Sequence, residues 1–424
     1  MTYYQALNFI HSLNRFGIKP GLCRIRSLME HLGNPQRGMN FIHIAGTNGK
    51  GSTSTAISNI MVASGKKTGL FISPFVVDFR ERIQINGEFI NKDDLANLTQ
   101  RVSEKVDIVN QETGDNVTEF EFITAVAFLY FKEQGCDIVV LETGLGGRLD
   151  STNIIEKPLV NVITKIDLDH TAVLGNTVEE IAGEKCGIIK ESAYVVTPST
   201  QNVKALKIIE DAASEKKATL RVAQRDLVEN IIVNPYGVSF IYKGMEIATK
   251  MPGIHQVENM TAAAETALCL GIDKDSIVKG IGETSFPARL EVVAKTPLVL
   301  LDGAHNENGA DVLCDYLDEH NLKPVIVLGM MRDKDCASVV KKISLRAKAV
   351  ITVTVQSNDR AESAEILGEL AEKYCNNVKC AKDYQDALLL AEERLECSDA
   401  PLLVCGSLYL ASDIRQSLIN KYKK

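Results

Sequence analysis

Phe41-Ile-His-Ile-Ala-Gly-Thr-Asn-Gly-Lys-Gly-Ser52 joins an apolar run to a glycine-rich turn, and a helical pattern follows over Thr53 to Ser64. Glycines let successive backbone N–H groups converge on a phosphate, and a helix N-terminus adds partial positive charge. Lys50 supplies a point charge for the outer phosphate oxygens. The stretch therefore predicts a strand, a nucleotide-binding loop and a helix, with these residues around the phosphates: Thr47, Asn48, Gly49, Lys50, Gly51 and Ser52.

The loop departs from the usual phosphate-loop spacing at two positions. Ile44 occupies the place of the first glycine, and Gly51 occupies the place of the hydroxyl residue that would ligate Mg²⁺. The magnesium of a bound nucleotide therefore needs other oxygen ligands. Ser73 and Glu142 are candidates, because each ends a predicted parallel strand, at the edge where open α/β sheets bind ligands. In isolation, each could equally be a loop cap.

Apolar runs alternate with helical patterns along the chain, which predicts an α/β protein built on parallel sheets. The clearest strands of the first half are expected at 41–45, 69–72, 138–141 and 160–164, with helices to about 110, over 118–133 and over 256–270. A second strand series is expected at 298–302, 325–329, 349–353 and 402–405. We place the boundary near 285–289, so that residues 1–287 form a phosphate-loop-type ATPase domain and 288–424 a smaller Rossmann-like domain.

Composition and charge narrow the class of partner. The 424 residues are 45% hydrophobic and 24% charged, which is typical of soluble globular proteins. The net charge of −8 gives a nucleic acid no general attraction. No segment approaches eighteen consecutive apolar residues, and the ten cysteines include no C-x-x-C pair, which favours reduced thiols. We expect a cytoplasmic monomer acting on small molecules, without membrane or nucleic-acid partners.

Thr164-Lys-Ile-Asp-Leu-Asp-His170 follows another predicted strand. A Thr-Lys-x-Asp turn can read guanine, so a regulatory GTPase competes with an ATP-using enzyme at this point. His170 could be a histidine on a surface loop or a ligand, and the sequence around it favours neither. Lys185, in a predicted helix, could be an ordinary solvated lysine.

A series of motifs resembles the folylpolyglutamate synthase and dihydrofolate synthase family, which belongs to the Mur-ligase-like amide ligases. In the first half these are Gly46-Thr-Asn-Gly-Lys-Gly-Ser52, Ser73-Pro74, Glu81-Arg-Ile-Gln-Ile-Asn-Gly87, Thr118-Glu-Phe-Glu121, Glu142-Thr-Gly-Leu-Gly-Gly-Arg-Leu-Asp150, Asp169-His170 and Glu184-Lys185. In the second half they are Pro252-Gly-Ile-His-Gln-Val-Glu-Asn259, Arg289-Leu-Glu291, Asp302-Gly-Ala-His-Asn306, Gly329-Met-Met-Arg-Asp-Lys-Asp335 and Gly406-Ser-Leu-Tyr409. The motifs span nearly the whole chain in the family's order, which favours a ligase over a GTPase.

The resemblance also implies roles for individual residues. It assigns Lys50, Lys185, His170 and Arg289 to catalysis, with Lys185 carbamylated beside a second metal ion. It assigns Ser73, Glu142 and His170 to Mg²⁺, and Asn259, Arg289, Asp302 and His305 to ATP together with the phosphate loop. Pro74, Phe75, Asp150 and Asn153 would contact the folate or pterin, and Ser407 the glutamate.

The activity implied by the resemblance is an ATP- and Mg²⁺-dependent ligation of L-glutamate to a folate, to dihydropteroate, or to both, through an acyl phosphate. A Mur-type ligase acting on another carboxylate is the alternative. Three positions depart from the family: Phe75 where histidine is frequent, Ala288 where glycine is usual, and Gln356 to Arg360 without the usual prolines. They affect the folate-side loop, the entry to Arg289 and the glutamate-side loop.

Overall fold

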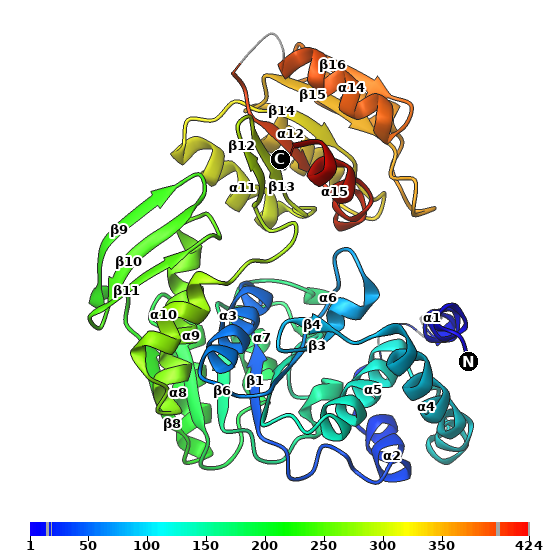
Figure 1. Cartoon of the computed structure of the whole chain (residues 1–424), viewed down its shortest axis with the longest axis vertical. Helices are drawn as coiled ribbons and strands as arrows, with labels where there is room; N and C mark the ends of the chain where they lie inside the picture. Colours follow the sequence, from blue (N-terminus) through cyan, green and yellow to red (C-terminus); the bar gives the residue numbers. More distant parts are fainter. Residues whose placement is uncertain (14–16, 18, 396–398, 423–424) are drawn as a thin grey trace.

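Three sheets organise the computed structural model, which describes residues 1–424 except 14–16, 18, 396–398 and 423–424 (Figure 1). The first sheet has eight strands in the order β4-β3-β2-β5-β1-β6-β7-β8. Their bounds are β1 Phe41–Ala45, β2 Thr68–Phe71, β3 Ile83–Ile85, β4 Glu88–Phe89, β5 Ile138–Glu142, β6 Val160–Ile163, β7 Tyr194–Pro198 and β8 Thr219–Ala223. All neighbours pair in parallel except at the β2, β3 and β4 edge, which is antiparallel.

Alternate residues of β5 enter the cores on the two faces of this sheet. Val139 and Leu141 pack under α1 (Tyr3–Ser12), α2 (Cys23–His31), α4 (Lys92–Thr113) and α5 (Glu119–Glu133). Ile138 and Val140 pack under α3 (Lys50–Ala63), α9 (His255–Cys269) and α10 (Lys274–Gly282). A strand covered by helices on both faces is apolar throughout, which explains the continuous apolar run in its sequence.

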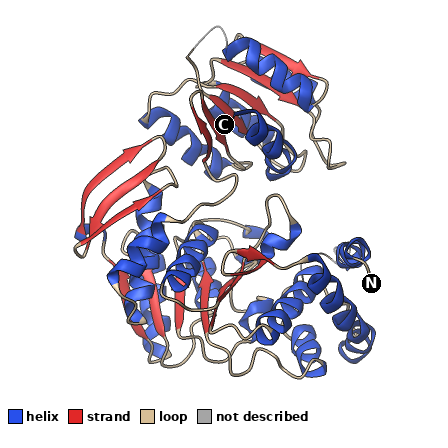
Figure 2. Ribbon diagram, in the orientation of Figure 1, coloured by secondary structure: helices blue, strands red, loops and turns tan. Residues whose placement is uncertain are grey.

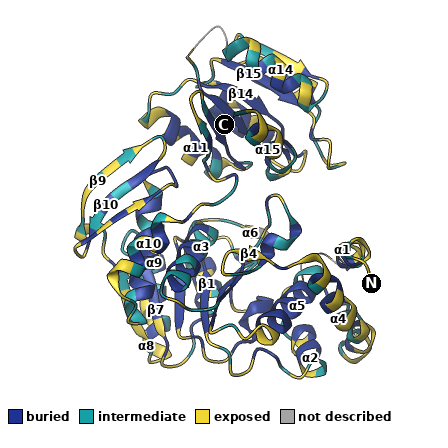
Figure 3. Ribbon diagram, viewed as in Figure 1, coloured by how far each residue is buried: buried dark blue, intermediate teal, exposed yellow. Residues whose placement is uncertain are grey.

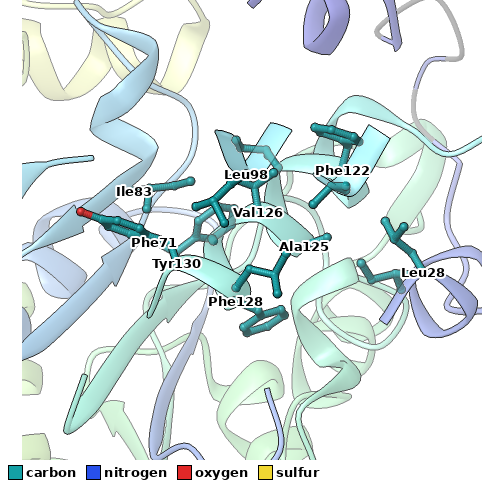
Figure 4. Close-up of a cluster of buried hydrophobic side chains, with 14 of the residues drawn as sticks. Leu28, Phe71, Ile83, Leu98, Phe122, Ala125, Val126, Phe128 and Tyr130 are labelled. Carbon is teal, nitrogen blue, oxygen red and sulfur yellow. The ribbon is translucent and has the colours of Figure 1, made fainter. Parts of the chain in front are cut away.

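The helix α5 is the centre of the first core. Thr118 and Glu121 form a capping box at its N-terminus, in which each side chain accepts the other residue's backbone N–H. Figure 4 shows Phe122, Val126 and Phe128 of this helix among side chains from α2, β2 and β3. The capped end therefore fixes where the helix begins, and its apolar side chains fix how it lies on the sheet.

The remaining elements of the first part continue the same layers. They are η2 (Phe79–Arg82), η3 (Ser151–Ile154), α6 (Thr171–Leu174), α7 (Val178–Cys186), α8 (Val203–Glu215) and η4 (Arg225–Leu227). An antiparallel sheet of β9 (Val228–Asn234), β10 (Gly237–Tyr242) and β11 (Met245–Thr249) lies at the side of the molecule, between the two larger sheets (Figure 2). The Tyr316 hydroxyl donates to the carbonyl oxygen of Pro235 at 3.0 Å and ties this small sheet to the last part of the chain.

The third sheet has six strands in the order β12-β13-β17-β14-β15-β16. Their bounds are β12 Glu291–Lys295, β13 Leu298–Leu301, β14 Val325–Leu328, β15 Ala349–Val353, β16 Val378–Ala381 and β17 Leu402–Cys405. Only β12 is antiparallel, and β17 lies between β13 and β14. One face carries α11 (Glu307–Glu319), α12 (Cys336–Ser344) and α13 (Ala364–Glu372), and the other carries α14 (Tyr384–Leu395) and α15 (Leu408–Tyr422).

The predicted α/β class with parallel sheets is confirmed, and the eight predicted strands agree with the structure to within one residue at each end. The helix predicted from Thr53 begins instead at Lys50, because the last residues of the glycine-rich loop form its first turn. Residues 283–290 join α10 to β12, and the predicted boundary falls in this connection. Figure 3 shows the inner strands of both large sheets buried and the outer faces of the helices exposed. In the described ranges, no helix combines the length and apolarity needed to cross a bilayer.

Candidate active site

Four neighbouring strands of the first sheet end at one edge, and the predicted nucleotide-side residues follow them. The glycine-rich loop follows β1, Ser73 lies two residues after β2, Glu142 is the last residue of β5, and Thr164 follows β6. Because β1 lies between β5 and β6, the loop is flanked by Glu142 on one side and by Thr164 on the other. The strand order thus assembles the site from segments that are distant in sequence.

The glycines of the loop are required by close contacts. A Cβ on Gly46 would lie 1.8 Å from the Thr164 hydroxyl oxygen. Gly49 caps α3 with a φ of +83°, and a Cβ there would lie 2.1 Å from the Asn259 side-chain oxygen. Side chains at these positions would push the loop away from both neighbours.

The Thr164-to-His170 segment braces the same loop. The backbone N–H groups of Thr47 and Asn48 donate to the Lys165 carbonyl oxygen at 2.9 and 3.1 Å. The Thr47 hydroxyl donates to the Asp167 carbonyl oxygen at 3.0 Å and accepts from the Asp167 N–H at 3.1 Å. The Thr-Lys-x-Asp turn therefore holds the phosphate loop in place, and this structural role explains its presence in the sequence.

Two lysines lie against the loop. Lys50 Nζ donates to the carbonyl oxygens of Gly46 and Thr47 at 3.1 and 3.2 Å, and Lys185 Nζ donates to Gly46 at 2.7 Å. Lys185 is 3% exposed, so it is not a solvated surface lysine. Burial, together with the charge of Lys50, lowers the Lys185 pKa from 10.5 to about 7, although Asp169 opposes the shift.

Ser73 and Glu142 are in direct contact. The Ser73 N–H donates to Glu142 Oε2 at 3.2 Å. Burial raises the Glu142 pKa from 4.5 to about 7, and the positive charges of Lys50 and Arg289 reduce the shift. The Ser73 backbone therefore holds the buried Glu142 carboxylate at the end of β5, beside the phosphate loop, and a carboxylate of this kind fits a divalent cation.

His170 stands apart from this pair. It adopts a left-handed backbone conformation with φ of +48° at the start of α6, and its side chain is half-exposed. Its Nε2 lies 3.7 Å from Asp169 Oδ2. Within the described chain, no hydrogen bond or ion pair joins His170 to Ser73 or Glu142, and no three acidic, histidine or cysteine side chains form a preformed metal cage.

The second half of the chain adds residues that face the loop. Asn259, on α9, donates through its amide to the Gln256 side-chain oxygen at 2.9 Å, and its own oxygen faces Gly49. Arg289 is exposed in the connection. Burial raises the pKa of Asp302, and the positive charge of Arg289 reduces that shift, as it does for Glu142. The Arg289 charge therefore acts on a carboxylate of each large sheet, Glu142 at the end of β5 and Asp302 after β13.

Asp302 and His305 follow β13. The Asp302 carboxylate accepts the N–H groups of Leu290 and Ala304 at 2.7 and 2.8 Å. His305 Nδ1 lies 2.8 Å from the Gly303 carbonyl oxygen. Burial lowers the His305 pKa below its ordinary value, and the negative charge of Asp169 reduces that shift. Asp302 thus fixes the loop that carries Arg289, through the Leu290 N–H.

The predicted folate-side residues divide into two groups. Phe75, after Pro74, has its ring centroid 5.5 Å from that of Phe79. Asp150 accepts the N–H groups of Leu145 and Thr152 at 2.8 and 2.9 Å, and burial raises its pKa.

Asn153 donates to the carbonyl oxygens of Arg148 and Gly187, both at 3.0 Å. Asn153 Oδ1 is buried without a hydrogen-bond partner in the described part of the chain. Asp150 and the Asn153 amide group therefore brace local loops, and Asn153 keeps one free acceptor.

Ser407 lies at the start of α15, where its hydroxyl oxygen accepts the Tyr409 N–H at 3.0 Å, and it is buried. The proline-poor loop near it is held by a different contact, because the Gln356 N–H donates to the Tyr384 hydroxyl at 2.6 Å. A cavity of about 960 Å³ lies along the connection, with Phe286, Arg289, Glu291 and Arg415 in its wall. Sequence patterns gave no sign of this cavity, since its wall comes from four separate segments.

Arg82 is a site residue that the sequence motifs did not single out. Its Nη1 donates to the Ser73 hydroxyl oxygen at 3.1 Å, and its side chain is buried. The only signal was its place inside the Glu81-to-Gly87 motif, to which no role was attached.

Comparisons with known proteins agree with this geometry. Residues 44–267 match the Mur ligase middle domain, and residues 288–408 match the Mur ligase, glutamate ligase domain. The chain is 37% identical to the dihydrofolate synthase/folylpolyglutamate synthase of Bacillus subtilis, over 98% of this chain and 99% of that protein. It is 35% identical to the folylpolyglutamate synthase of Lacticaseibacillus casei, over 99% of both chains.

A solved structure is similar along the whole length. It is Mycobacterium tuberculosis folylpolyglutamate synthase complexed with ADP and AMPPCP, and it superimposes with a TM-score of 0.87 at 28% identity, covering 98% of this chain and 99% of that one. The match favours the ligase interpretation over the GTPase alternative. The chain therefore belongs to the Mur ligase family, in its folylpolyglutamate synthase and dihydrofolate synthase branch.

Proposed function

We propose that this protein is an ATP-dependent ligase that joins L-glutamate to a folate, to dihydropteroate, or to both. The observation that carries the proposal is the convergence of Lys50 and Lys185 on the Gly46 carbonyl oxygen of the phosphate loop, beside Glu142 at the end of the neighbouring strand β5. This arrangement suits transfer of a phosphoryl group to an acceptor held between the two parts of the chain, residues 1–287 and 288–424. We also propose that residues 1–287 bind ATP and the acceptor and that 288–424 bind glutamate.

The chemistry follows from the poor reactivity of a carboxylate. A carboxylate oxygen of the acceptor attacks the γ-phosphorus of ATP, the bond to ADP breaks, and an acyl phosphate forms. The glutamate amine then attacks the acyl carbon, phosphate leaves, and an amide remains. Lys50 and Arg289 would stabilise the charge on the transferring phosphoryl oxygens.

Ser73, Glu142 and His170 would hold Mg²⁺, and the burial of the Glu142 carboxylate at the end of β5 supports the assignment of Glu142. Mg²⁺, when bound, neutralises charge on the phosphate oxygens. We propose that a carbamate on Lys185 completes a second metal site, because its low pKa favours the neutral amine that reacts with carbon dioxide. That the enzyme acts as a cytoplasmic monomer stays a prediction.

The decisive experiment measures ADP formation with ATP or GTP, with and without acceptor and glutamate. We expect turnover only with ATP, acceptor and glutamate together. Phosphate release that ignores the acceptor and glutamate would contradict the ligase. Radiolabelled glutamate supplied with dihydropteroate or with tetrahydrofolate, in parallel, identifies the amide that forms, and another acceptor in place of both would favour a different Mur-type ligase.

A further inference from the structure

Arg82 is a buried cation held at the edge where the predicted acceptor would react. It ends η2, and its carbonyl oxygen accepts the Ile72 N–H at 3.2 Å, directly before Ser73. This backbone contact fixes the Arg82 side chain beside the end of β2. Arg82 is 9% exposed, and its guanidinium contacts the hydroxyl oxygen of Ser73, whose backbone N–H in turn donates to Glu142.

The Arg82 guanidinium is poorly paired. It carries five N–H donors. Its Nη1 bonds Ser73, its Nε has no partner among the described residues, and its Nη2 lies 3.7 Å from Glu119 Oε1, which exceeds hydrogen-bond range.

Two other arginines of the first part of the chain are paired with carboxylates at hydrogen-bond distance. Arg24, also buried, donates through Nε to both Glu121 oxygens at 3.0 Å and through Nη1 to Asp115 at 2.8 Å. Arg80, in the same short helix as Arg82, bonds Asp78 through Nη2 at 2.6 Å. Leaving a buried charge poorly paired is costly, and Arg82 has only a long ion pair with Glu119 and an unpartnered Nε among the described residues. This incomplete pairing indicates a partner that arrives from outside.

Two aromatic rings limit what that partner can be. The guanidinium carbon of Arg82 lies 5.3 Å from the ring centroids of both Phe75 and Phe79. Rings at this distance interact with the face of the guanidinium plane, which leaves its N–H edge for hydrogen bonds. A carboxylate matches that edge because it can accept two parallel N–H bonds.

We propose that Arg82 binds the carboxylate of the acceptor that becomes the new amide, and that it orients this group toward the phosphate loop. The nucleotide phosphates have their own partners in Lys50 and the loop, whereas Arg82 lies beside Ser73 and Phe75. Arg82 forms no covalent bond in this scheme. The inference rests on the proposed ligase function and adds a residue that selects for a carboxylate.

The test compares two ligands that differ only at the reacting group. One is the acceptor that the wild-type enzyme turns over, and the other is the same molecule with its reacting carboxylate replaced by a carboxamide. Binding of each is measured in the presence of a non-hydrolysable ATP analogue. For the wild type we expect the acid to bind roughly 10- to 100-fold more tightly than the amide, the range for a charge-assisted hydrogen bond.

Arg82→Ala should bring this ratio close to one and leave affinity for the ATP analogue unchanged within about threefold. Arg82→Lys, which keeps the charge without the planar fork, should give an intermediate ratio. Arg80→Ala is the matched control, because it removes a neighbouring arginine paired with Asp78, and it should keep the wild-type ratio. A purely structural Arg82 would weaken both ligands in parallel.

The outcomes separate the two proposals. An unchanged acid-to-amide ratio in Arg82→Ala would overturn the role of Arg82 while the ligase function stands. Absence of acceptor-dependent turnover in the wild type would contradict the ligase function itself. If Arg82→Ala does not fold, as judged by its thermal unfolding, the Arg82→Lys ratio decides: a value equal to that of the wild type overturns the proposal.

Discussion

Lys185 and Lys50 direct their ammonium nitrogens at one acceptor, the carbonyl oxygen of Gly46, at 2.7 and 3.1 Å. Two cations on one oxygen repel each other, and Lys185 is the more deeply buried of the two. This explains why its pKa falls to about 7. At slightly alkaline pH much of the Lys185 amine is therefore neutral and able to form a carbamate.

Replacing Lys185 with Ala should reduce turnover by about 100-fold or more, because it removes a carbamate that would hold the metal. Steady-state kinetics measure the loss, and added acetate should restore part of it. Carbon-13 NMR in ¹³C-bicarbonate should show a carbamate signal in the wild type that disappears in the variant. Lys204→Ala, which breaks an exposed ion pair with Glu179, is the control. Near-full activity of Lys185→Ala would show that Lys185 is an ordinary lysine with no carbamate role in catalysis.

Glu142 should make the metal-free protein less stable as pH rises. Its pKa is about 7 in the fold against an ordinary 4.5, so the native state binds more protons between these values. The stabilisation from the protonated form is complete below pH 4.5 and is lost as pH rises through about 7. Glu142→Gln should therefore unfold at a higher temperature than the wild type at pH 8 without metal, and the difference should vanish near pH 4.5. Thermal unfolding at both pH values checks this, and equal pH profiles would argue against it.

Gly49→Ala should abolish ATP binding. The new Cβ would meet the Asn259 side-chain oxygen at 2.1 Å, and the loop would have to move. Gly65→Ala is a close control, since Gly65 has the same φ of +83° with no atom within 4 Å of the added carbon. Calorimetric titration with an ATP analogue should show binding in the control and none in Gly49→Ala. Equal binding by both would mean that the loop tolerates the collision.

Ala288→Gly should stabilise the protein. Ala288 has a φ of +50°, a left-handed conformation that costs an L-residue about 1–2 kcal/mol, more than the entropy that glycine adds to the unfolded chain. The expected gain is up to about 1 kcal/mol by urea unfolding. Ala294→Gly, in the extended strand β12, should instead destabilise. A loss of stability in Ala288→Gly would show that the strain is offset by contacts of the methyl group.

Arg289→Ala should lower turnover more than it lowers ATP affinity. Arg289 influences Glu142 and Asp302 from the connection, so its interaction should strengthen as charge develops on the transferring phosphoryl group. Single-turnover rates and the dissociation constant of an ATP analogue measure the two effects separately. Equal losses in both would indicate simple ground-state binding.

The sequence predicted the strand ends well because each parallel strand is a short apolar run that stops at a polar residue. Ser73 and Glu142 were found in this way, and the structure places them in contact. Arg82 was not found, since the residues that it contacts lie elsewhere in the sequence. Ser73 and Phe75 belong to the loop after β2, and Glu119 belongs to α5. A charged pair such as Glu81-Arg82 looks like an exposed surface in sequence.

Motif spacing also identified Asp150 without revealing what its side chain does. Its oxygens accept backbone N–H groups of the loop in which it lies, a contact that depends on the loop's conformation. The insertion of β5 between β2 and β1 was equally hidden, because strand order depends on how helices pack and not on apolar runs. Sequence patterns thus located the elements, and packing decided their neighbours.

The third sheet depends on β17, its last strand in the sequence, because β17 lies between β13 and β14. We call the part of the chain that contains this sheet, residues 288–424, the second lobe. Until residues 402–405 pair with both β13 and β14, the lobe consists of two fragments with open strand edges. The loop carrying Asp302 and His305 directly follows β13, which is one of the two strands with an open edge. Translation must therefore pass residue 405 before a competent enzyme can exist, and proteolytic loss of this strand would inactivate the protein and expose two edges prone to aggregation.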